Sequence, residues 1–270
     1  MIYKACRIRR SSFWQRRAAI SWLWSCAICT SLAAAVPLSH SANATSEPEQ
    51  RRTRVPTPPK DGEQWQPGLH YSILIGQAKT DVPLGKIEVR ELFMYTSPLS
   101  LRMQPYLKQW LKNKPNYVEF VRSPSVVFPH ARLQARMYFT LEELGRLDLH
   151  DALFAWTFEK EHYPIYHTIS RPDVPGYFKL NLAFAKTNKL NEVKFCETYE
   201  SNRVEDKVIE AEIGTHKYLV SGTSTLVVNG KYSTSVQRLM YASGETEDAA
   251  YGHLFRLVNY LAAAEASVSE

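Results

Sequence analysis

Cysteine is scarce in this chain of 270 residues, and its distribution limits the chemistry that the chain can perform. The four cysteines are Cys6, Cys26, Cys29 and Cys196, so only one lies beyond residue 44. A single thiol cannot form an internal disulfide, and a cycle between dithiol and disulfide needs two thiols. The spacing of Cys26 and Cys29 matches a redox pair, but we interpret it as coincidence because both lie inside an apolar leader.

Motifs of several other catalytic and metal-binding classes are also missing. The chain has no glycine-rich phosphate loop and no Gly-x-Ser-x-Gly nucleophile elbow. His162 and His167 match no compact pattern of metal ligands, and Pro164 between them favours a loop, so we interpret both as solvated loop histidines. We therefore expect no metal, no cofactor and no serine-hydrolase chemistry.

The excess of positive charge is confined to the N-terminus. The whole chain has a formal net charge of +6, and residues 1–44 contain six Lys or Arg and no Asp or Glu. Removing this surplus of six leaves residues 45–270 with no net charge. A basic surface for nucleic acid is therefore not expected, and we expect no nucleic-acid partner.

The first 44 residues have the order of a secretory signal peptide. Basic residues come first, an apolar run extends from Ala18 to Leu38, and small residues precede a cleavage expected after Ala44. The run approaches the length that crosses a bilayer, so an uncleaved inner-membrane anchor is the alternative, and membrane contact is expected only in that case. Residues 45–67 are polar and proline-rich, which predicts a flexible linker.

Beyond the linker, the spacing of apolar residues predicts an α/β fold. Strands are expected over 70–75, 87–95, 117–122 and 225–228, and from Tyr232 after a turn at Asn229-Gly230. Helices are expected over 97–112, 130–147, 149–161, 190–199, 203–215 and 248–264. The third strand should lie parallel to the second, because the connection between them contains a helix. The order is thus β-β-α-β, a helical block, and β-β-α.

Two segments resemble the DsbA family of periplasmic thiol oxidases. Residues 86–100 read KIEVRELFMYTSPLS, where the family reads much like EFFxYxCPHC. Residues 220–232 read VSGTSTLVVNGKY, where the family reads much like VxGTPTLxVNGKY. The resemblance implies a thioredoxin-like fold over 68–265 with a helical insertion at about 128–215. It also implies a location in the periplasm.

In this resemblance, Ser97 and Ser100 stand where the family has its two reactive cysteines. Pro98 is kept, and Leu99 stands where the family usually has histidine. A hydroxyl cannot form a disulfide, so we expect this motif to contain no catalytic residue. Ser97 is instead expected to cap the helix, with Pro98 at its first position.

Two further positions of the resemblance belong to the same site. Glu91 lies six residues before Ser97, where the family has an acid beneath the cysteines that assists proton transfer. An unpaired buried carboxylate is costly, so we expect water or the serine hydroxyls to satisfy Glu91. Thr223-Ser224 replaces a Thr-Pro that the family holds in the cis form. A cis bond before serine costs about 2.5–4 kcal/mol, so we expect a trans bond and a reshaped loop.

The resemblance leaves two classes of function open, besides a structural role in an envelope assembly. The first is a redox-inactive module that binds unfolded or extended polypeptide, or a redox-active paralogue, in the former substrate groove. The second is a thiol-disulfide oxidoreductase acting on envelope proteins through Cys196 or by another route. Val193 and Tyr199 around Cys196 predict a helix and a partly buried, structural thiol.

Overall fold

The computed structural model describes residues 65–168, 172–218, 220 and 224–267. The leader and residues 45–64 lie outside the described residues, as does Thr223. The described strands form a five-stranded sheet with the order β1-β5-β4-β2-β3. The strands are β1 (Ser72–Ile73), β2 (Ile87–Phe93), β3 (Val118–Pro124), β4 (Thr225–Val228) and β5 (Tyr232–Ser235).

A parallel β-α-β unit forms the centre of the sheet. β2, α3 (Pro98–Asn113) and β3 follow one another, and β2 pairs with β3 in parallel from Ile87↔Val118 to Phe93↔Pro124. Every residue of β2 is buried, as expected for a strand that has neighbours on both edges. The predicted strand, helix and parallel strand are confirmed. This unit places the start of α3 just beyond the carboxyl end of β2.

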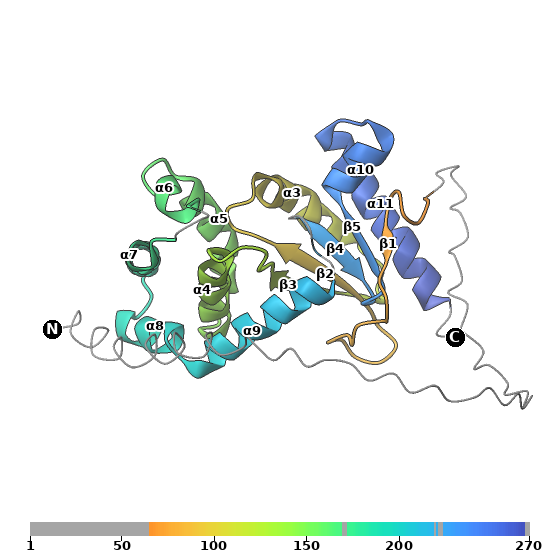
Figure 1. Ribbon diagram of the computed structural model, residues 1–270. Helices are drawn as coiled ribbons and strands as arrows, with labels where there is room; N and C mark the ends of the chain where they lie inside the picture. Colours follow the sequence, from red (N-terminus) through yellow and green to blue (C-terminus); the bar gives the residue numbers. More distant parts are fainter. Residues whose placement is uncertain (1–64, 169–171, 219, 221–223, 268–270) are drawn as a thin grey trace, which may run out of the picture. The chain divides into compact units, whose positions relative to one another are not determined.

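One face of the sheet is covered by α3 and α11 (Glu247–Ala266), with α10 (Val236–Ser243) packed against α11 (Figure 1). Val89 of β2, Leu107 of α3 and Leu254 of α11 belong to one buried apolar cluster. Burying a side chain of this size contributes about 1.5–3 kcal/mol to stability. This cluster is the main core that fixes α3 relative to β2.

The opposite face of β2 holds a smaller apolar cluster around Leu92 and a buried ionic group. Arg90 Nε donates to Glu88 Oε1 at 2.8 Å, and Arg90 Nη2 donates to Asp81 at 2.5 Å. Burial alone would lower the pKa of Arg90, but these carboxylates outweigh it and the pKa is raised. Because side chains alternate along a strand, this group lies on the face away from Glu91.

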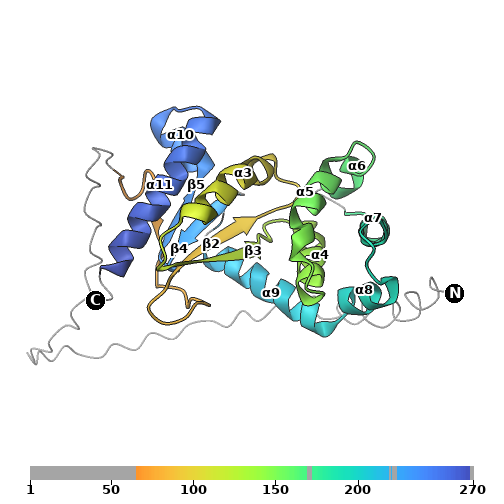
Figure 2. The same ribbon diagram turned by 180° about the vertical axis from the view of Figure 1, so that it is seen from behind.

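A helical block lies between β3 and β4 and forms the left-hand part of Figure 1 and the right-hand part of Figure 2. α4 packs against α9, α8 and α7 within this block. Its elements are α4 (Ala131–Glu143), the 3-10 helix η1 (Leu147–Leu149), α5 (His150–Phe158), α6 (Tyr163–Tyr166), α7 (Val174–Thr187), α8 (Glu192–Tyr199) and α9 (Asn202–Lys217).

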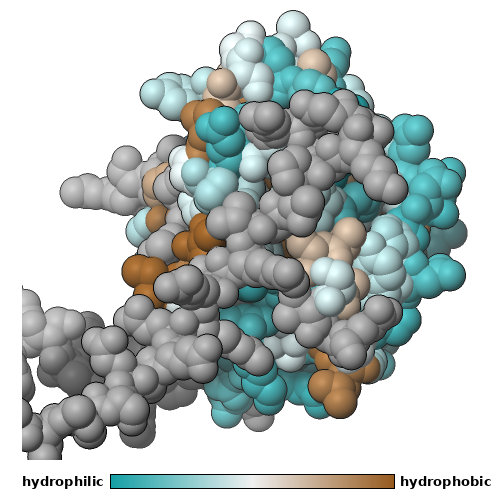
Figure 3. All heavy atoms as spheres, turned by 90° about the vertical axis from the view of Figure 1, so that its right-hand side faces the viewer, coloured by the Kyte–Doolittle hydropathy of each residue, from teal (hydrophilic) through white to brown (hydrophobic). Residues whose placement is uncertain are grey.

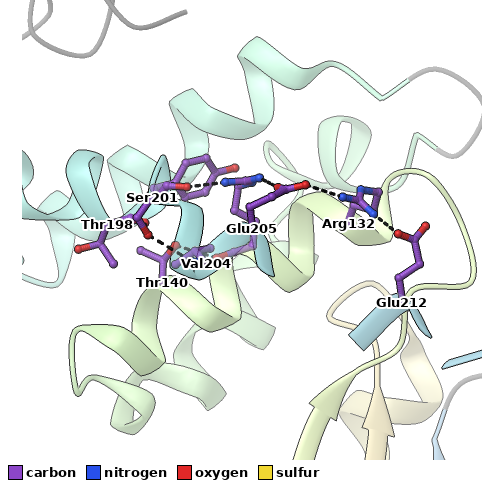
Figure 4. Close-up of polar contacts among 9 residues, drawn as sticks. Arg132, Thr140, Thr198, Ser201, Val204, Glu205 and Glu212 are labelled. Atoms are coloured by element: carbon purple, nitrogen blue, oxygen red, sulfur yellow. Dashed lines mark hydrogen bonds and ion pairs between the residues drawn. The ribbon is translucent and has the colours of Figure 1, made fainter. Parts of the chain in front are cut away.

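Ion pairs join α4 to α9 on the partly exposed side of the block. Glu205 of α9 accepts from Arg132 Nη2 at 2.8 Å and also from Arg136, and Arg132 reaches Glu212 as well (Figure 4). Arg136 Nη1 donates to the carbonyl of Tyr199 at 2.7 Å, which satisfies one of the last carbonyls of α8. The two helices are antiparallel, so the basic start of α4 faces the acidic residues of α9.

Several helices differ from the sequence-based prediction. α7 and α10 were not predicted, and the four-residue helix α6 occupies the segment expected to be a loop. The expectation that His162 and His167 are solvated is wrong, because both rings are partly buried against aromatic neighbours. His162 Nδ1 donates to the carbonyl of Trp156 at 2.9 Å. No helix in the described segments has both the length and the hydropathy needed to span a bilayer.

Candidate functional site

Ser97 caps α3 at the carboxyl end of β2. Its backbone is extended (φ −89°, ψ 118°), and its Oγ accepts from the backbone N–H of Ser100 at 3.2 Å. Pro98 occupies the first position of the helix, where its missing N–H costs no hydrogen bond. The predicted cap is confirmed. A serine in this place satisfies a free amide at the helix start, which is a structural task.

Ser100 is fully buried one turn below Ser97 and contacts two other segments. Its Oγ accepts from the backbone N–H of Met94 at 3.3 Å and from Ser224 Oγ at 3.1 Å. Ser224 directly precedes β4 and has a positive φ of 60°. The structure therefore brings Ser97, Ser100 and Ser224 together. The predicted trans bond between residues 223 and 224 involves Thr223, which lies outside the described residues.

Gln104 connects Ser100 to the buried acid of β2. Its Nε2 donates to the carbonyl of Ser100 at 3.0 Å and to Glu91 Oε1 at 2.9 Å. Gln104 follows Ser100 by four residues, so it lies on the same side of α3. A polar network thus runs from the helix start down to Glu91.

Glu91 is buried and paired with Arg122. Arg122 Nε donates to Glu91 Oε2 at 2.6 Å, and Arg122 Nη2 lies 3.4 Å from Gln104 Oε1. Burial alone would lower the pKa of Arg122, but the Glu91 carboxylate outweighs it and the pKa is raised. The expectation that water or serine hydroxyls satisfy Glu91 is wrong. Its partners are the guanidinium of Arg122 and the amide of Gln104. The parallel register of β2 and β3 places Arg122 opposite Glu91, and the first turns of α3 place Gln104 there.

The helical block holds the two residues before Ser97. Gln134 of α4 accepts from the Thr96 amide at 3.3 Å and donates to Thr96 Oγ1 at 3.0 Å. Thr157 of α5 donates to the carbonyl of Tyr95 at 2.9 Å. The Tyr95 hydroxyl lies 2.9 Å from His150 Nδ1, also on α5. No local pattern in the sequence predicts these contacts, because they join residues far apart in the chain.

A cavity of about 480 Å³ opens beside the start of β4. Thr225, Ser233 and Ser235 supply hydroxyls to its wall, and Leu69 and Tyr241 supply apolar surface. The Tyr241 side chain is 88% exposed. On the face shown in Figure 3, the hydrophobic residues among the coloured atoms form separate groups surrounded by hydrophilic ones. The cavity thus combines hydrogen-bonding groups with isolated apolar contacts.

Sequence comparison identifies the family, although no family model matches the chain. The chain is 29% identical over 171 residues to the thiol:disulfide interchange protein DsbA of Pseudomonas syringae pv. tomato, covering 63% of this chain and 74% of that relative. It is 31% identical over 171 residues to the protein of the same name from Pseudomonas aeruginosa, covering 63% and 75%. The chain belongs to the DsbA family.

Solved DsbA structures agree with this assignment. The crystal structure of Pseudomonas aeruginosa DsbA superposes with a TM-score of 0.63 at 26% identity, covering 76% of this chain and 96% of that chain. The oxidoreductase DsbA of Xylella fastidiosa gives a TM-score of 0.59 at 25% identity, covering 73% and 96%. This DsbA-family chain therefore has the thioredoxin-like α/β fold that its sequence predicted, with the helical block inserted after β3.

Cys196 of this DsbA-family chain lies in a helix, α8, as predicted, and with 8% of its surface exposed it is more buried than the partial burial that was predicted. It is part of the helical block, whereas Ser97 begins α3 beside the sheet. The other three cysteines lie outside the described residues. Within the described segments, no group of three or more His, Cys, Asp or Glu side chains is arranged to hold a metal ion. The site at the start of α3 is built from serines, an amide and an ion pair.

Proposed function

We propose that this DsbA-family protein binds extended polypeptide without exchanging disulfides. In the family resemblance, Ser97 and Ser100 take the positions of the cysteine pair; in the structure they lie at the cap and first turn of the helix that follows the central strand. The observation that carries the proposal is that this turn presents hydroxyls and no thiols. A hydroxyl is little ionised at neutral pH and forms no S–S bond, so the turn can hold backbone but cannot carry electrons.

The buried acid supports the same conclusion. A carboxylate that assists thiol chemistry must take up and release a proton beneath the reactive pair. Glu91 is instead in a close ion pair with Arg122 and accepts a hydrogen bond from Gln104. These partners belong to β3 and α3, so the Glu91 carboxylate is already used in contacts within the fold. Glu91 therefore has a structural role, which is to link α3 to the sheet.

The surroundings of β4 favour an extended polypeptide as the ligand. Ser224 precedes β4, which begins at Thr225 beside the serine turn and pairs antiparallel with β2, and the 480 Å³ cavity adjoins Thr225. Peptides commonly bind by main-chain hydrogen bonds, with side chains entering neighbouring pockets. Leu69 and Tyr241 provide apolar contacts for such side chains, while Ser233 in the lining provides a hydroxyl for the peptide backbone. The proposed occupant is unfolded or extended protein, or a segment of a redox-active paralogue.

The proposal includes the location of the protein. The basic leader, apolar run and small residues before position 45 direct export, and the protein acts in the periplasm on other exported chains. If the leader were retained, the same domain would be anchored to the inner membrane. Mass spectrometry of the protein isolated from the cell envelope distinguishes the two, because only cleavage yields an N-terminus at residue 45.

Binding of a reduced, carboxymethylated model protein tests this function. The purified protein should bind it and slow its aggregation, and Tyr241→Ala should weaken binding several-fold by removing apolar surface at the cavity. Ile213→Ala, which removes a 60% exposed side chain from α9, is the matched control and should bind normally. Equal binding by both variants would show that the cavity takes no part in binding polypeptide. Disulfide exchange that is lost in Cys196→Ala would establish the oxidoreductase instead.

A further inference from the structure

Two histidines are buried where the helical block meets the serine turn. His130 precedes α4 and is 1% exposed, and His150 begins α5 and is 3% exposed. His130 Nδ1 and His150 Nε2 are buried and have no hydrogen-bond partner in the described structure. His167 Nε2, at the end of α6, is in the same state. Each ring therefore has a nitrogen that would carry an unsatisfied N–H after protonation.

Aromatic rings surround these imidazoles. The His150 ring lies 4.9 Å from the ring of Phe93 and 5.1 Å from that of Phe154, both edge-on. The His130 ring stacks on Phe128 with centroids 5.7 Å apart and an interplanar angle of 12°. Such surroundings pack well against neutral imidazole but solvate an imidazolium cation poorly.

The charged groups near the rings do not favour a cation. His150 is influenced by the positive charges of Arg122 on β3 and Lys108 on α3, and both ions are already paired, with Glu91 and Asp151 respectively. The hydroxyl of Tyr95, two residues after β2, lies against Nδ1, and the Tyr138 ring of α4 packs edge-on at 6.0 Å. Burial lowers the pKa of His167, and the charge that His130 would carry in acid lowers it further. No ion pair joins a carboxylate to His130, His150 or His167 among the described contacts.

The same helices hold the residues before Ser97. Gln134 follows His130 by one turn of α4 and carries both contacts to Thr96. Thr157 lies on α5 with His150 and donates to the carbonyl of Tyr95. A displacement of either helix away from β2 therefore breaks the hydrogen bonds that fix the Tyr95–Thr96 segment.

We propose that protonation of His130 and His150 in mild acid loosens the hold of α4 and α5 on Tyr95 and Thr96 and thereby opens the site to polypeptide. The identification of the ligand as polypeptide rests on the proposed function, but the opening of the site does not. The regulated element is the contact between the helical block and the end of β2, and the signal is a fall in pH below neutrality.

The direction of the effect follows from the environment of the rings. Burial lowers the pKa of His130, and burial followed by the charges of Arg122 and Lys108 lowers the pKa of His150 to about 2. In the opened form both return toward the ordinary value of 6.5. The closed form is thus favoured fully above pH 6.5 and loses stability as the pH falls. Each imidazole that is protonated only on opening shifts the equilibrium about tenfold per pH unit.

Amide hydrogen exchange tests the opening directly. In the wild-type protein, corrected protection of the Thr96 amide, which donates to Gln134, should fall about fivefold to thirtyfold between pH 6.5 and 5.5, where carboxylates contribute little. His150→Phe and His130→Leu, which keep apolar packing, should each reduce that slope. His216→Gln, on the exposed side of α9, should leave it unchanged. Unchanged protection in the wild-type protein would overturn the proposal, whether or not the variants fold.

The capture of polypeptide separates this inference from the proposed function. Binding that rises between pH 6.5 and 5.5 in the wild-type protein, and rises less in His150→Phe, supports both. Acid-dependent exchange without binding at either pH overturns polypeptide binding and leaves the histidine-controlled opening supported. Binding that is equal at both pH values, despite opening, overturns the regulatory role of the two histidines.

Discussion

Glu91 and Arg122 lie directly opposite each other in the parallel register of β2 and β3, and Arg122 Nε donates to Glu91 Oε2 at 2.6 Å. The Glu91 side chain is fully buried, whereas the side chain of Arg122, on the edge strand β3, is partly exposed. The acid beneath the serine turn is therefore part of the sheet's own structure. Its charge is balanced without any group from a substrate.

Removing Arg122 should be costly because it leaves a buried carboxylate without its cation. We expect Arg122→Met to lower the free energy of unfolding by about 3–5 kcal/mol, measured by urea denaturation at pH 7. The double variant Arg122→Met with Glu91→Gln should recover much of this loss. A single variant as stable as the wild type would show that the ion pair does not balance the charge of Glu91.

The ion pairs between α4 and α9 should contribute measurably because Glu205 accepts from two arginines. We expect Glu205→Gln to lower the free energy of unfolding by about 1–3 kcal/mol. Asp148→Asn, which breaks an exposed pair with Arg146, is the control and should change stability by less than about 1 kcal/mol. Added salt should reduce the difference in the free energy of unfolding between Glu205→Gln and the wild type. A difference that does not change with salt would indicate a packing effect instead.

Stability should also depend on pH in the acid range through Glu265 of α11. Lys231, Asn229 and Tyr232 all donate to its carboxylate at 2.7–2.9 Å. Burial alone would raise the pKa of Glu265, but these hydrogen bonds outweigh it and the pKa is lowered. The stabilisation is present above the ordinary pKa of 4.5 and is lost as the pH falls through the lower folded value.

Thermal unfolding between pH 6 and 3 checks the role of Glu265. Glu265→Gln should be less stable than wild type at pH 6 and should lose less stability below about pH 4.5. This range lies below the one in which the histidines act, so the two effects are separable. Parallel curves for the variant and the wild type would exclude Glu265 as a source of the pH dependence.

Restoring two thiols should restore redox chemistry if the serines stand at the cysteine positions. Ser97→Cys with Ser100→Cys places two sulfurs one helical turn apart, with the first at a helix N-terminus that lowers thiol pKa. We expect the double variant to oxidise a reduced model protein, and Ser224→Pro to increase the rate. Ser97→Cys alone is the control and should form mixed disulfides without turnover. A folded double variant without activity would contradict the alignment of the site.

The sequence was most informative where local signals and the family resemblance agree. Ser97 and Pro98 predicted the start of α3, and Asn229-Gly230 predicted the hairpin between β4 and β5. The hairpin residues indeed have positive φ values of 50° and 62°, as a two-residue turn requires. A Cβ on Gly230 would meet the carbonyl oxygen of Ala78 at 2.4 Å, so glycine is also needed there for space.

Contacts between distant segments could not be predicted in the same way. The pairing of Glu91 with Arg122 depends on strand register, and that of Tyr95 with His150 joins residues 55 positions apart. α10 was missed because it begins directly after β5 without an intervening turn; Ser235 ends the strand and caps the helix. Such features follow from tertiary packing, which overrides local sequence preference.

The most direct test of the account is turnover in a disulfide-exchange assay with the purified protein and a reduced model substrate. We expect no oxidation or reduction above the uncatalysed rate, and no difference between the wild type and Cys196→Ala. Catalytic turnover by the wild type that disappears in Cys196→Ala would contradict the proposal that this family member binds polypeptide without redox chemistry.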